Sequence, residues 1–278
     1  MSFTLKYLGQ EKTFDKNVRL LDLIEKNDKS IICARVNNRV RELTYEVYYD
    51  ATIEFLTVKD VDAIKIYEAS LRFVVAMAFA RAYPNLKIRF CYNVSRSIFV
   101  QIINGKSNMD MLRNIEHEIN KIIEADYPLK RFVVSKDEAK EIYIKNGQLD
   151  KLDILKYRPE KTVHLYDCDG YLNYMFSHMV PSTGYLKEYR IRMYSPGFIL
   201  QYPRSECGGQ IPEFVDAPTF GKTLKESHEW GKIAGADSVA GINQHIAHDG
   251  VIDFIQLCEA RHNRMLTELG DMIEADIS

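Results

Sequence analysis

The sequence predicts an α+β protein that opens with short strands, continues as helices on an antiparallel sheet and closes with helices. Three observations indicate this class. The first sixty residues carry short stretches that alternate polar and apolar residues with period two, which is typical of strands. Residues 62–83 instead form one long, mostly apolar helical stretch that Pro84 ends. From Thr219 onward the apolar spacing is helical, with short breaks.

Composition indicates a soluble globular chain long enough for two domains. Of its 278 residues, 46% are hydrophobic and 27% are charged, and the net charge of −2 gives no overall basic field for nucleic acid. The five cysteines show no C-x-x-C pair, which favours reduced thiols over a disulfide framework or a zinc ribbon. The N-terminus lacks the apolar core of a signal peptide, and no run approaches the ~18 apolar residues of a membrane span. We therefore expect a cytoplasmic protein without membrane contact.

The first domain, residues 1–60, is expected to be a small β-grasp unit. "FTLKYL" and "ATIEFLTV" read as strands, and Asn37 and Asn38 within "ICARVNNRVREL" form a hairpin signal. Between them, "QEKT" reads as a polar turn and "VRLLDLIEK" as a short helix.

The second domain is expected to span residues 61–218, with a helical tail over 219–278. After the long helix, "KIRFCYNV" and "SIFVQII" read as strands, and Ser107 as the cap of an amphipathic helix. Ser135 and Gly147 mark the start and end of another helix. "HLYDCDGYLNYMF", "LKEYRIRMYS" and "FILQYP" complete the antiparallel sheet.

The order of several motifs resembles a known family. "ARVNNRVREL" and "ATIEFLTV" resemble the TGS domain, the β-grasp module at the head of threonyl-tRNA synthetases. "IEHEINKII", "VVSKDEAKEIYIKNG" and "MVPSTGYLKEYRI" resemble the editing-type second domain of the same enzymes. The tail, from "HEWGKIAG" onward, resembles the helical connector of bacterial uridine kinase-like proteins, which place both domains before a P-loop kinase domain.

This resemblance implies a non-catalytic accessory or regulatory region of a nucleoside kinase. The kinase domain, with its ATP and Mg, would be a C-terminal partner that is absent from this chain, and the uncapped last helix leads us to expect that the chain continues. Two alternatives stay open. One is an aminoacyl-tRNA deacylase that works without metal, and the other is an RNA-binding module.

The editing-type resemblance also implies four metal-binding positions. The family carries an H-x-x-x-H on the long helix, where residues four apart share a face, and a C-x-x-x-H before the "VP" turn, which together give a tetrahedral set. In this sequence those positions fall on Ala69, Phe73, Met175 and Met179, none of which is a usable zinc ligand. We therefore expect neither a metal nor another cofactor in this chain.

Two further motifs are interpreted as accidental. "DAPTFGKT", residues 216–223, nearly matches a P-loop, but Asp216 replaces the first glycine and Pro218 removes an amide donor. His245, His248 and His262 complete no known metal pattern, which favours a solvated helix face. No catalytic residue is assigned.

A ligand-binding cleft is predicted around "YMFSHMVPSTGY", residues 174–185. The loop would present two hydroxyls and backbone amides to a small molecule, anion or nucleotide in a groove between the long helix and the sheet. The alternative is a structural relic, with an exposed loop histidine and a tight turn that uses Gly184 for positive φ. The predicted lining is Ser70, Phe73, His178, Ser182, Thr183 and Tyr185.

A second candidate is a surface for RNA or another anion. "LKEYRIRMYS" alternates, so Arg190 and Arg192 share one face of a strand, with aromatic residues between the cations. A solvated sheet face is the alternative. The predicted cations of this surface are Lys187, Arg190, Arg192 and Arg204.

Overall fold

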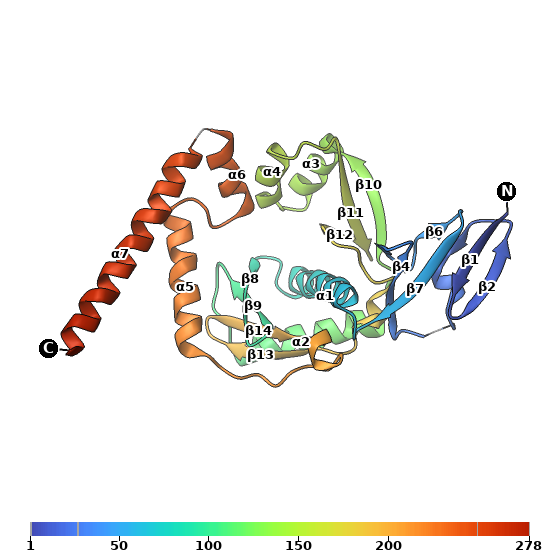
Figure 1. Cartoon of the computed structure of the whole chain (residues 1–278), viewed down its shortest axis with the longest axis horizontal. Helices are drawn as coiled ribbons and strands as arrows, with labels where there is room; N and C mark the ends of the chain where they lie inside the picture. Colours follow the sequence, from blue (N-terminus) through green and yellow to red (C-terminus); the bar gives the residue numbers. More distant parts are fainter. Residues whose placement is uncertain (1, 27, 249, 278) are drawn as a thin grey trace. The chain divides into compact units, whose positions relative to one another are not determined.

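The computed structural model describes residues 2–26, 28–248 and 250–277, and it has the expected mixed α+β fold (Figure 1). The chain divides into two units. Unit 1 comprises residues 1–134 and 162–217, and unit 2 comprises residues 135–161 and 218–278. The break after Ala217 falls at the predicted end of the second domain, whereas residues 135–161 cluster with the tail.

Five strands form the first sheet of unit 1, in the order β2-β1-β7-β4-β5. The pair β1–β7 is parallel, and the other pairs are antiparallel. Inward-facing side chains such as Leu5, Ile53 and Leu56 are buried beneath it. The strands are β1 (Phe3–Tyr7), β2 (Gln10–Phe14), β4 (Ile31–Val36), β5 (Arg39–Arg41) and β7 (Ala51–Thr57).

The turns of this sheet partly correct the predicted elements. Asn37 and Asn38 have φ of 45° and 64°, which confirms the β4–β5 hairpin. The first turn lies at Leu8 and Gly9, with φ of 48° and 74°, so "QEKT" belongs to strand β2 and the predicted turn there is wrong.

The predicted helix at "VRLLDLIEK" is also corrected. It is strand β3 (Val18–Arg19), paired with β6 (Glu46–Val47), followed by the 3₁₀ helix η1 (Leu20–Leu23). At Ile24 the backbone is extended, with φ −105° and ψ 163°, so the helix cannot propagate.

The second sheet has the order β13-β14-β9-β8 and packs on helices α1 and α2. Alternate residues of its strands, such as Ile98, Val100 and Phe198, enter the shared core, while Phe99 and Ile199 face the other side. The elements are α1 (Val61–Ala82), β8 (Ile88–Val94), β9 (Ser97–Ile102), α2 (Met109–Glu124), β13 (Arg190–Tyr194) and β14 (Gly197–Gln201).

Helix α1 is long because apolar residues occupy nearly every side of it. Thirteen of its residues are buried, including Phe73 and Phe79. Helix α2 is amphipathic, and its cap is Asn108, whose side chain accepts from the Met111 N–H at 2.8 Å. The predicted cap Ser107 is therefore wrong by one residue.

A third sheet, β10-β11-β12, completes unit 1. The chain leaves it after β10 (Lys130–Ser135), forms two helices of unit 2, and returns through β11 (Thr162–Cys168) and β12 (Tyr171–Tyr174). The segment that follows β12 carries four of the six predicted cleft residues, and the other two lie on α1.

Unit 2 is helical. Ser135 and Glu138 form the predicted capping box, and Gly147, with φ of 67°, ends the helix as expected. Trp230 stacks on Phe254 with ring centres 6.5 Å apart. The helices are α3 (Lys136–Lys145), α4 (Asp150–Lys156), α5 (Pro218–Ile233), α6 (Val239–Ala247) and α7 (Val251–Ile277). Among the described residues, no helix combines the length and the apolar character that a bilayer crossing requires.

Candidate functional site

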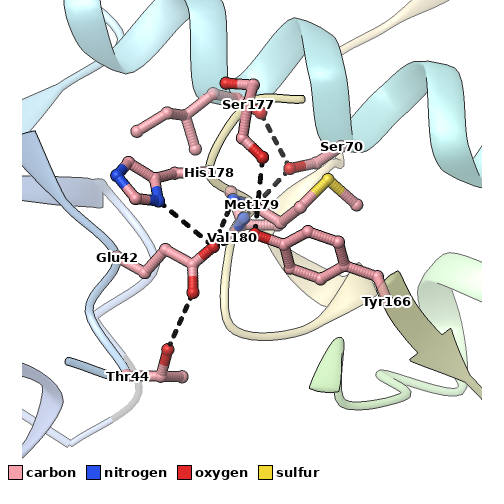
Figure 2. Close-up of polar contacts among 9 residues, drawn as sticks. Glu42, Thr44, Ser70, Tyr166, Ser177, His178, Met179 and Val180 are labelled. Carbon is pink, nitrogen blue, oxygen red and sulfur yellow. Dashed lines mark hydrogen bonds and ion pairs between the residues drawn. The ribbon is translucent and has the colours of Figure 1, made fainter. Parts of the chain in front are cut away.

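The loop after β12 is fixed to helix α1 by one buried serine. Ser70 is fully buried, and its hydroxyl donates to the Ile66 carbonyl at 2.7 Å. The same oxygen accepts from the Val180 N–H at 3.0 Å (Figure 2). Ala69 and Met179 are the neighbours of these two residues. The helix turn and the loop to which the resemblance assigns metal ligands therefore lie against each other.

The side chains at these positions do not fit a zinc ion. Phe73 is fully buried and packs edge-on against Tyr171, with ring centres 5.2 Å apart. Ala69 and Met179 are buried, and Met175 packs against the same core. Within residues 2–26, 28–248 and 250–277, no three His, Cys, Asp or Glu side chains are grouped so that they could hold a metal. The space is filled by apolar packing.

We expect the purified chain to contain less than about 0.1 zinc per molecule, because a stable site needs three or four N, S or O ligands. Elemental analysis after exposure to excess zinc and desalting measures this content. The Met179→His variant should remain equally metal-free, since one imidazole cannot hold the ion. About one zinc per chain would contradict the placement of the four positions.

A buried carboxylate, Glu42, joins the first sheet to this loop. It accepts hydrogen bonds from the Tyr166 hydroxyl and from the Met179 N–H, the latter at 3.0 Å. His178 Nδ1 lies 3.5 Å from the same oxygen, and the Thr44 hydroxyl donates to the other oxygen at 3.3 Å. Figure 2 shows Tyr166, His178 and Met179 converging on this carboxylate.

The electrostatics favour a charged Glu42 and a neutral Tyr166. Burial raises the pKa of Glu42, but the bonds from His178, Tyr166 and Met179 outweigh it, so the pKa lies below its usual value. Burial, together with the Glu42 charge, raises the pKa of Tyr166 well above its usual value. The carboxylate thus accepts several donors at once and holds the loop in place.

The predicted residue His178 belongs to this network. The sequence places no acid next to it, and its partner lies more than a hundred residues earlier. Sequence reasoning missed Glu42 because no local pattern joins a β-grasp loop to the "VPSTG" turn.

A second polar cluster lies at the "VPSTG" turn itself, around Asp126. Its Oδ1 atom accepts from the Ser182 hydroxyl at 2.5 Å and from the Gly184 N–H at 2.9 Å. Lys29 forms an ion pair with the other oxygen, and its Nζ lies 5.6 Å from the centre of the Tyr185 ring. Burial raises the pKa of Asp126, but the hydrogen bonds from Lys29, Ser182 and Gly184 outweigh it, so the pKa lies below its usual value.

Gly184 serves this cluster by its lack of a side chain. Its φ is not positive, so the predicted use of the left-handed region is wrong. A β-carbon at this position would overlap Asp126 Oδ1 and Lys29 Nζ and lie 2.7 Å from Asp126 Cγ. The glycine therefore permits the close approach of the ion pair.

The structure corrects the lining of the predicted groove. Ser70, Phe73 and Thr183 are fully buried, and the Thr183 hydroxyl donates to the Ile122 carbonyl at 2.7 Å. Ser182 and Tyr185 instead face a cavity of about 570 Å³ on the β-grasp side of the loop. The other residues of this cavity are Leu21, Asp22, Ile24, Glu25, Lys26, Asp28, Lys29, Pro128 and Pro181.

The predicted cationic surface lies on and beside the edge strand β13. Ile191 and Met193 pack on the core, so Arg190 and Arg192 point to the opposite face of the sheet. Both arginines and Lys187 are exposed, and in the described part of the chain none of the three has a carboxylate partner within 4.0 Å.

Aromatic residues accompany these cations, as the sequence indicated. The Arg192 guanidinium lies 4.3 Å from the centre of the Phe214 ring, and Phe214 packs against Tyr194. Arg204 differs from the other predicted cations because it pairs with Glu206 at 3.0 Å and donates to the Tyr202 hydroxyl at 2.7 Å. Its charge is therefore already compensated.

The two motifs interpreted as accidental lie mostly in helices of unit 2. Lys222 and Thr223 are inside helix α5, so no phosphate-binding loop forms there. His245 stacks on Phe254 with ring centres 4.7 Å apart, and its Nε2 lies 2.9 Å from the Ala234 carbonyl oxygen. This histidine is therefore part of the helix packing, whereas the sequence indicated a solvated face.

Comparison with known proteins relates this chain to one class, the threonyl-tRNA synthetases, and to their N-terminal region. No protein-family model matches the chain. It is 29% identical over 188 residues to the threonine–tRNA ligase of Thermotoga neapolitana, which covers 66% of this chain and 29% of that enzyme. It is 25% identical over 195 residues to that of Carboxydothermus hydrogenoformans, covering 68% and 31%. The chain thus spans less than a third of the length of these relatives.

Proposed function

We propose that this chain is a non-catalytic RNA-binding module whose partner is a tRNA or a tRNA-like RNA. The similarity to threonine–tRNA ligases, whose name states that they join threonine to tRNA, supports this class of partner. The observation that carries the proposal is the exposed, uncompensated set of Lys187, Arg190 and Arg192 at one sheet edge.

The chemistry of this edge suits a nucleic acid. Guanidinium groups form paired hydrogen bonds with phosphates, and a strand of exposed cations contributes affinity even where the net charge of the chain is near zero. Tyr194 and Phe214 offer ring faces beside Arg192, on which an unpaired base can stack. Single-stranded ends and loops of a folded RNA present such bases.

The contacts around the loop after β12 support binding without catalysis, because its polar side chains already have partners. The hydroxyls of Ser70 and Thr183 are committed to backbone partners, and Glu42 and His178 lie against each other. The deacylase alternative would need a group free to activate water in a cavity. The relatives reported above add no support to the predicted nucleoside-kinase parent, and that origin, with its ATP and Mg, stays a prediction.

We expect the double variant Arg190→Glu/Arg192→Glu to weaken tRNA binding at least about tenfold, because two phosphate contacts are lost and two repulsions are added. Fluorescence anisotropy with end-labelled, uncharged tRNA measures the dissociation constant. The salt dependence of binding should also become shallower.

The matched control is Lys106→Glu/Arg113→Glu, which makes the same change in net charge at two exposed cations outside β13. It should retain most of the affinity. Equal losses of affinity in both variants would mean that net charge alone, and not the β13 surface, explains the weaker binding. An absence of tRNA binding by the unaltered chain would refute the proposal. Hydrolysis of mischarged tRNA above the uncatalysed rate would favour the deacylase.

A further inference from the structure

Helix α7 carries an apolar stripe without a partner in unit 2. Its members are between 50% and 66% exposed, and every described residue from His262 onward is exposed. They recur at the spacing of one helix face. The α7 stripe consists of Met265, Leu266, Leu269, Met272 and Ile273.

The first part of α7, unlike the rest of the helix, packs on aromatic side chains of α5 and α6. Phe254 stacks on Trp230 and His245, and the Arg261 guanidinium lies 5.0 Å from the Trp230 ring centre. Figure 1 shows that α7 diverges from α5 toward the C-terminal end of α7. Exposed apolar residues also occur in this first part, at Ile252 and Ile255, and the five stripe residues lie beyond it.

Two polar side chains flank the stripe symmetrically. His262 and Asp276 each lie seven residues from Leu269, one before and one after it. Seven residues are close to two turns, so all three share the face of the stripe. A cation-forming group at one end and a carboxylate at the other make this face complementary to itself when it is reversed.

We propose that two copies of this chain associate through antiparallel pairing of their α7 stripes. With the twofold axis at Leu269, the leucines of the two copies face each other, and His262 of each copy faces Asp276 of the other. The ends of the stripe then form two identical polar pairs, and its centre forms a dry apolar seam.

Antiparallel pairing is favoured over parallel pairing by charge. A parallel pair would place Asp276 beside Asp276, and two carboxylates at neighbouring positions repel each other. The antiparallel seam covers all five stripe residues, which span roughly 12 Å of helix. The interaction is independent of β13 and of RNA.

Sedimentation equilibrium of the whole chain tests the proposal. The apparent mass should rise with concentration from 32.2 kDa toward twice that value. Leu269→Glu should raise the dissociation constant of the dimer at least about tenfold, because two carboxylates would meet in an apolar seam. Thr267→Glu, which adds the same charge on the opposite helix face, should leave it nearly unchanged.

A charge exchange distinguishes the orientation. Asp276→Lys should weaken the dimer, and the double variant His262→Asp/Asp276→Lys should restore it, because each new carboxylate again faces a cation. A monomer at all concentrations, equal effects of Leu269→Glu and Thr267→Glu, or failure of the exchange to restore association would each overturn the proposal.

Discussion

Replacing Glu42 by alanine should lower the free energy of unfolding of unit 1 by about 3–5 kcal/mol, the usual effect of removing one partner from a buried charged network. The Tyr166 hydroxyl and the Met179 N–H would lose their acceptor in a region without water access. Urea unfolding followed by far-ultraviolet circular dichroism measures the loss.

The effect should also depend on pH in one direction. Because the folded-state pKa of Glu42 lies below its usual 4.5, its contribution is fully present above that value and is lost as the pH falls through the folded-state pKa. The difference in stability between the unaltered chain and Glu42→Ala should therefore shrink as the pH falls below about 4.5.

Glu46→Ala serves as the control for this series. Glu46 lies four residues further along the chain, in strand β6, and is exposed, so its removal should change stability by less than about 0.5 kcal/mol. Equal losses for the two variants would mean that the Glu42 network does not hold the loop.

Gly184→Ala should destabilise unit 1 by about 1–3 kcal/mol, because the added methyl group displaces Asp126 and Lys29. Both overlapping atoms end flexible side chains, so the chain still folds. The Asp126 carboxylate, however, would move away from the Ser182 hydroxyl and the Gly184 N–H. The same urea titration measures the change.

Gly270→Ala is the matched control, since a β-carbon built there meets no atom within 4 Å apart from its chain neighbours and the nearby backbone of its own helix. It sits within helix α7 and should stabilise that helix by up to about 1 kcal/mol. If Gly184→Ala proved as stable as the unaltered chain, the close approach of Asp126 would have no energetic weight.

Elements with a strong local pattern were predictable from the sequence. The apolar stretch over 62–83 became α1, offset by one residue, and the Asn37–Asn38 pair gave the expected hairpin. Strand β2 was missed because four of its five side chains are exposed and polar, so it carries no apolar period. The helix expected at 18–26 failed because an extended residue, Ile24, follows one 3₁₀ turn.

The site was predictable only as a segment. The motif "VPSTG" located the loop, and the resemblance located the side chains that fill the place of a metal. The sequence could not show which hydroxyls would be free. The hydroxyls of Ser70 and Thr183 donate hydrogen bonds to backbone carbonyls of helices α1 and α2, and only the fold reveals these partners. Asp126 and Lys29 are 97 residues apart in the chain, and only the folded structure joins them.

The single tryptophan of this chain, Trp230, stacks on Phe254 within unit 2. The fluorescence of this residue therefore reports on the helices of unit 2. A melting curve recorded at tryptophan wavelengths would not register the loss of the sheets of unit 1, the Glu42 network or the Asp126 cluster. The two optical signals therefore report on different units of the chain. Tryptophan fluorescence reports on unit 2, and the strand signal in circular dichroism reports on unit 1.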